Sequence, residues 1–109
     1  MNYKKFLFFA LLILLIGGSY KPEDDDKIKD CSYKGFKLYG KIKIVENFPD
    51  LKVKVVDNFP DLKVKIVNDF PDECGKWKFV ENFPDLKIKF VDNFEDIKIK
   101  FVKNFPGKP

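Results

Sequence analysis

Arginine, histidine, threonine and glutamine are absent from this 109-residue chain, and serine occurs only twice. Without histidine the chain lacks the side chain that titrates nearest neutral pH, and with it most acid–base catalysis and imidazole metal ligation. Without arginine it has no planar guanidinium to clamp phosphate or carboxylate groups. These absences argue against an enzyme, and we expect no catalytic residue, no cofactor and no metal site.

The residues that are present favour one small folded domain. Hydrophobic residues make up 45% of the chain and include thirteen phenylalanines, so a core can form and disorder is not expected. The 21 lysines exceed the 17 acidic residues, which gives a formal net charge of +4.

The first nineteen residues have the layout of an export signal. Lys4 and Lys5 form a basic start, an unbroken apolar run covers Phe6–Ile16, and the small residues Gly17–Ser19 follow. Eleven apolar residues are fewer than the roughly 20 that span a bilayer, which favours a cleaved signal over a membrane anchor. We therefore expect residues 1–19 to be removed and the protein to reach the bacterial periplasm or the exterior, with no stable membrane anchor.

Residues 20–30 are interpreted as an acidic, solvated spacer, because Glu23–Asp26 supply four adjacent acids without apolar spacing. A calcium site is the weaker interpretation, since the spaced ligands and the glycine of a calcium loop are missing. Loss of Lys4 and Lys5 with the signal would leave nineteen lysines against seventeen acids. This small excess weakens any argument for nucleic-acid binding, and we expect no nucleic-acid partner.

An eleven-residue repeat fills the chain from Lys41 onwards. Each copy alternates lysine with apolar residues, which is the period of a β-strand. Proline recurs at one position in five of the six copies, which excludes a helical coiled coil of the same period. The copies are residues 41–51, 52–62, 63–73, 76–86, 87–97 and 98–108, interrupted by Cys74–Gly75.

Each copy predicts one strand of about six residues followed by a tight Asn-Phe-Pro-Asp turn. In the second copy Leu51, Val53 and Val55 share one face, which we expect to be core, while Lys52 and Lys54 face solvent. Five of the six copies carry at least as many acids as lysines, so the lysine rows are expected to meet rows of acids.

One phenylalanine precedes the turn position in every copy, and proline is expected to hold it in an extended conformation. An exposed ladder that stacks sugars or nucleobases is one interpretation. Burial at the end of the core is favoured, because the residue stands at the same turn position in each copy. These residues are Phe48, Phe59, Phe70, Phe83, Phe94 and Phe105.

Three features surround the regular copies. Trp77 replaces an aliphatic residue and is expected to fill extra volume beside the Cys74–Gly75 interruption. Phe36–Tyr39 alternates once more and could form a seventh, atypical strand. Cys31 and Cys74 are expected to form one structural disulfide, because an exported chain with two cysteines most simply carries one. A metal site or a catalytic thiol would need further soft or imidazole partners.

The repeated pattern of lysine, aliphatic residue, valine and acid, followed by Asp-Leu-Lys, resembles the septoil, or seven-crossing, knot domain family. Gly75–Val80, Ile88–Asp92 and Ile99–Val102 carry the resemblance, which covers about Lys37–Pro109. The family comprises small, often exported, β-rich bacterial repeat proteins of uncharacterised function. The resemblance implies a compact knotted β-structure, whereas the periodicity alone leaves a meander and a short solenoid open.

We therefore predict an all-β domain over residues 31–109, built from six or seven short strands and linked once by a disulfide. The expected function is that of an exported, non-catalytic module with a structural or binding role. A lysine-rich binder of anionic cell-envelope polymer is the alternative, and an enzyme of unknown type is the least favoured class. The partner and the oligomeric state do not follow from the sequence.

Overall fold

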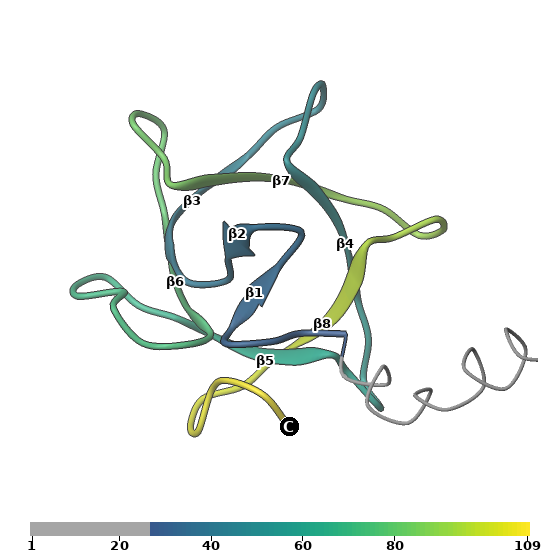
Figure 1. The fold of residues 1–109 in the computed structure, drawn as a ribbon. Helices are drawn as coiled ribbons and strands as arrows, with labels where there is room; N and C mark the ends of the chain where they lie inside the picture. Colours follow the sequence, from purple (N-terminus) through teal and green to yellow (C-terminus); the bar gives the residue numbers. More distant parts are fainter. Residues whose placement is uncertain (1–26) are drawn as a thin grey trace, which may run out of the picture.

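The computed structural model describes residues 27–109 as a closed six-stranded barrel with a small two-stranded sheet (Figure 1). The expected signal at residues 1–19 and the possible calcium ligands Glu23–Asp26 lie outside the described residues. Within residues 27–109 no helix has the length and apolar character needed to cross a membrane. The barrel strands are β3 (Gly40–Ile44), β4 (Leu51–Val55), β5 (Leu62–Ile66), β6 (Lys76–Phe79), β7 (Leu86–Phe90) and β8 (Ile97–Phe101), and β1 (Ser32–Tyr33) pairs with β2 (Phe36–Lys37). The prediction of an all-β domain is confirmed.

All six barrel strands run parallel, and most strands that follow each other in sequence are not neighbours. The order around the barrel is β3-β6-β5-β8-β4-β7. The chain lays down β3, β4 and β5 on a first lap and inserts β6, β7 and β8 beside them on a second. The change of lap occurs between β5 and β6, at the Cys74–Gly75 interruption. This interlaced, closed path excludes both a meander and an open solenoid.

The register explains how parallel strands are joined by loops of only six residues in four of the five connections, although such connections usually need a dozen or more. Ile44 at the end of β3 pairs with Ile88 of β7, and Ile88 also pairs with Leu51 at the start of β4. The end of one strand and the start of the next are therefore in register with the same residue of the single strand between them. The chain steps over that strand instead of travelling back along the barrel, so the expected tight turn is wrong.

Each of these loops is fixed at both ends to the strand that it crosses. In the loop between β3 and β4, Val45 N–H donates to the carbonyl of Ile88 and Asp50 N–H donates to the carbonyl of Lys87, both at 2.8 Å. The Asp50 carboxylate also accepts a hydrogen bond from Lys87 N–H at 2.9 Å. The same side-chain bond joins Lys98 to Asp61, Lys41 to Asp85 and Lys52 to Asp96. The recurring aspartate thus closes a loop around a strand.

Loss of this aspartate should matter only where a loop crosses a strand. Asp72 occupies the same repeat position but lies within the connection from β5 to β6, two strands that are direct neighbours. We expect Asp50→Ala to lower the free energy of unfolding by about 1 kcal/mol and Asp72→Ala to change it by less than about 0.5 kcal/mol. Urea unfolding of the two variants measures both values, and equal losses would contradict the closing role.

The inward-facing residues form three rows across the barrel, and the first two rows make the core. In β4, Leu51 and Val53 are 1% and 0% exposed, whereas Val55 on the same face is 47% exposed. The prediction that all three are core is wrong for the third, because the strand ends there and no described element covers that end of the barrel. The third row consists of Ile44, Val55, Ile66, Phe79, Phe90 and Phe101.

The opposite end of the barrel, where the strands begin, is closed by residues 28–38, which we call the cap. Ile28 and Leu38 are buried in the core, so Ile28 belongs to the packed domain although the expected spacer extends to residue 30. Tyr33 and Phe36 pack against the same core. Phe36 lies in the two-stranded sheet, and a seventh barrel strand is therefore not formed.

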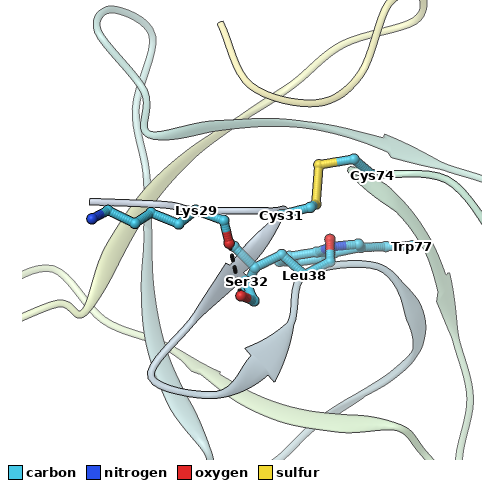
Figure 2. Close-up of a disulfide and its surroundings, with 6 residues drawn as sticks. All are labelled: Lys29, Cys31, Ser32, Leu38, Cys74 and Trp77. Carbon is cyan, nitrogen blue, oxygen red and sulfur yellow. Dashed lines mark hydrogen bonds between the residues drawn. A yellow bond between two sulfur atoms is a disulfide. The ribbon is translucent and has the colours of Figure 1, made fainter. Parts of the chain in front are cut away.

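A disulfide between Cys31 and Cys74 joins the cap to the connection between β5 and β6, with the two Cα atoms 5.7 Å apart (Figure 2). Trp77 is fully buried next to this junction, and its indole N–H donates to the Leu38 carbonyl at 3.0 Å. Gly75 has a φ of 84°, and a Cβ there would clash with the Lys63 carbonyl oxygen. The interruption in the repeat is therefore the point where cap, barrel and change of lap meet.

Candidate functional site

Lysine occupies both outward-facing positions of every barrel strand, and we call these twelve residues the lysine belt. All of them are exposed or half-buried on the outer wall. The belt consists of Lys41, Lys43, Lys52, Lys54, Lys63, Lys65, Lys76, Lys78, Lys87, Lys89, Lys98 and Lys100.

The strand register places each belt lysine directly opposite another belt lysine. Lys52 pairs with Lys89 across β4 and β7, and Lys54 pairs with Lys98 across β4 and β8. The remaining pairs are Lys41 with Lys78, Lys43 with Lys87, Lys63 with Lys100 and Lys65 with Lys76. The expectation that lysine rows meet acid rows is wrong within the sheet, because the winding sets lysine against lysine. The acids lie in the loops, from which four aspartate carboxylates reach the backbone N–H of Lys41, Lys52, Lys87 and Lys98.

The belt is poorly neutralised by the part of the chain that the structure describes. Within residues 27–109 one belt lysine forms an ion pair, Lys76 with Glu73 at 2.9 Å. Two lysines outside the belt, Lys27 and Lys34, pair with loop aspartates at 3.3 Å. Like charges directly opposite each other destabilise a sheet. Residues 27–109 as a whole contain eighteen lysines and thirteen acids, so this part of the chain is cationic.

The second feature of the outer surface is the set of six phenylalanines in the loops, which we call the loop-tip phenylalanines. They are 79% to 92% exposed, and the prediction that they are buried is wrong. Their φ angles lie between 52° and 64°, so the expected extended conformation is also wrong. The loops project away from the barrel (Figure 1), which carries these residues away from the core. They are Phe48, Phe59, Phe70, Phe83, Phe94 and Phe105.

The loop-tip phenylalanines and the belt lysines do not vary among the six copies, whereas neighbouring loop positions do. The residue after the loop valine is Glu46, Asp57, Asn68, Glu81, Asp92 or Lys103. A positive φ is more easily adopted by glycine or asparagine than by phenylalanine, and an exposed ring gains nothing from burial. The two constant features thus work against stability, which is typical of residues kept for contact with a partner.

The two cysteines that the sequence singles out lie apart from this surface. Cys31 and Cys74 are joined in the disulfide at the cap. Among residues 27–109 no polar or charged residue is fully buried. In the same part of the chain no three histidine, cysteine or acidic side chains are grouped to hold a metal ion. The described surface can therefore attract a negatively charged partner through the lysine belt and make apolar contacts through the loop-tip phenylalanines. Sequence analysis offered an exposed phenylalanine ladder and a lysine-rich binding surface only as alternatives, because strand pairing, which sets lysine against lysine, is not visible in a repeat.

The fold defines a small capped β-barrel in which one repeated strand is wound in two interlaced laps. Residues 35–109 match the family described as the 7(1) septoil knot domain, and the chain belongs to this family. The resemblance seen in the sequence is thereby confirmed, and the interlaced path is consistent with a knotted domain. The chain is also similar to an uncharacterized protein of Synechocystis sp., slr1025, with 50% identity over 42 residues. That match covers 38% of this chain and 38% of the relative.

Proposed function

We propose that this protein is an exported, non-catalytic binding module whose lysine belt holds an anionic cell-envelope polymer, such as a glycan that bears phosphate or carboxylate groups. The observation that carries the proposal is the set of six lysine pairs that face each other across neighbouring strands. A polyanion laid on the wall supplies the missing counter-charge and relieves repulsion within every pair that it contacts.

The chemistry of the two constant side chains fits a polymer better than a small anion. Lysine is a compact charge on a flexible stem, which follows an irregular backbone and does not demand one orientation. The pairs are spread around the wall, so a chain that contacts several of them gains from multivalency. The loop-tip phenylalanines stand beside the belt and offer rings on which the apolar faces of sugars can stack.

Export is supported by two observations of different kinds. Residues 1–19 combine a basic start, an apolar run and small residues, the layout of a cleaved signal. The Cys31–Cys74 disulfide fits an oxidising compartment such as the periplasm or the exterior. An envelope polymer is the abundant polyanion that a bacterial protein meets there.

Changing one lysine of a facing pair to glutamate should weaken polymer binding and stabilise the fold at the same time. Lys78→Glu, Lys89→Glu and Lys100→Glu each set a carboxylate opposite a lysine of the first lap. We expect the triple variant to lose at least about tenfold in affinity, with its free energy of unfolding raised by roughly 0.5–2 kcal/mol. Titration of labelled polyphosphate and of hyaluronate, with neutral dextran as a blank, measures the affinity.

The matched control changes three lysines outside the belt, Lys29, Lys37 and Lys103, to glutamate and so alters the net charge equally. It should retain most of the affinity. Binding by the natural chain should also fall by about tenfold to a hundredfold between 50 and 200 mM salt if three to five charges are neutralised. Equal losses in the two triple variants, or no binding to either anionic polymer at low salt, would refute the proposal.

A further inference from the structure

The third row leaves an apolar face at the open end of the barrel, away from the belt and from the loop tips. Its six residues point the same way as the core but remain 36% to 49% exposed. No described element covers them, whereas the cap covers the first row at the other end. An apolar patch of a few hundred Å² that survives on a small domain marks an interaction site.

The residues of this face alternate in size around the barrel. The first-lap strands contribute the aliphatic side chains Ile44, Val55 and Ile66, and the second-lap strands contribute phenylalanines. Because the two laps interlace, the strand order brings an aliphatic residue and a phenylalanine alternately around the whole ring. In the order of the strands the ring is Ile44, Phe79, Ile66, Phe101, Val55 and Phe90.

We propose that this end face docks against the same face of a second copy of the chain. A two-fold axis lying in the plane of the face can set every phenylalanine of one copy over an aliphatic residue of the other. Large side chains then meet small ones throughout, which is the condition for close packing. The contact is isologous, and the cap blocks the other end, so association closes at a dimer and does not continue into a filament.

The size of the face sets the strength of the dimer. Six side chains that are each less than half exposed offer less area than the roughly 800 Å² per partner of stable complexes, so we expect a dissociation constant on the order of 10⁻⁴ M. Salt should strengthen the dimer, because the belt lysines nearest the open end approach those of the second copy and repel them less when screened. This direction is opposite to that expected for polymer binding, which makes the two associations separable.

Sedimentation equilibrium of the purified secreted protein, from about 10 μM to about 1 mM, tests the dimer. We expect the average mass to rise towards twice that of the monomer, and to rise at lower concentration in 500 mM than in 50 mM salt. Phe90→Lys should keep the protein monomeric throughout. The matched control is Phe94→Lys, in the same repeat but at a loop tip and 88% exposed, which should dimerise normally.

Circular dichroism establishes that each variant is folded, and Val55→Lys, at a more exposed position of the same face, replaces Phe90→Lys if that variant unfolds. A monomer at about 1 mM in both salts would overturn the proposal. Equal loss of association in Phe90→Lys and Phe94→Lys would do the same. Capture of the monomer on phosphatidylglycerol vesicles through Phe90, with no dimer formed, would assign the face to a lipid surface instead.

Discussion

Replacing Trp77 by alanine should lower the free energy of unfolding by about 4 kcal/mol, the largest effect that we expect from a single side chain in the barrel. The Trp77 side chain is fully buried, and the other five residues of its row are aliphatic. Its indole N–H bonds to the Leu38 carbonyl, so the side chain also holds the cap to the barrel. Alanine would leave a cavity in the second row and remove that bond.

Two further variants divide this loss into its parts. Trp77→Phe retains most of the buried ring but cannot donate to Leu38, and should cost about 1–2 kcal/mol. Phe79→Ala removes a ring from the same strand at a position that is 38% exposed, and should cost less than Trp77→Ala. Urea unfolding followed by circular dichroism measures all three variants. A loss in Phe79→Ala as large as that in Trp77→Ala would show that the open end is as well packed as the core.

The alternation in the sequence predicts the strands and the faces of the first two rows, because a period of two residues reports which side of a strand is apolar. The alternation does not report how many of the inward-facing positions along a strand are buried by the rest of the barrel. Val53 and Val55 have the same residue type and the same facing, yet one is buried and the other is half exposed. The difference arises from the ends of the barrel, which are a property of the assembled strands and not of a single copy.

The topology could not be predicted from the repeat, because near-identical copies do not specify which strand lies beside which. Lys52 lies opposite Lys89, thirty-seven residues away, and no local pattern selects that pairing. The same limit explains the error at Phe48. The recurrence of this residue beside a turn proline led us to expect burial, but the loop passes over β7 and the Phe48 ring is 90% exposed.

The clearest sequence signal of the candidate site lay in what the copies keep constant. Strand packing accounts for the constant apolar positions, and loop closure accounts for the aspartates. Neither accounts for the lysines at both outward positions or for the loop-tip phenylalanines, for which a stable fold would be served as well by other residues. A comparison of copies that asks which constant residues lack a structural reason would have located this surface before the structure was known.

Removal of the Cys31–Cys74 disulfide should have an effect as large as the loss of Trp77. The bond closes a loop with a sequence separation of 43 residues, and the chain-entropy model gives about 4 kcal/mol for a loop of this length. Without it the cap is held by the packing of Ile28 and Leu38 and by a few hydrogen bonds. We expect the double variant Cys31→Ser, Cys74→Ser to melt roughly 15–30 °C below the natural protein, measured by circular dichroism.

Reductant supplies the control, because it breaks the same bond and leaves the sequence unchanged. The reduced protein then differs from the double variant only in carrying two thiols in place of two hydroxyls. It should lower the melting temperature of the natural protein by a similar amount and leave the double variant unchanged. Amide hydrogen exchange then shows where stability is lost, and the cap and the start of β6 should exchange fastest. A double variant that melts within about 3 °C of the natural protein would mean that non-covalent packing alone holds the cap on the barrel.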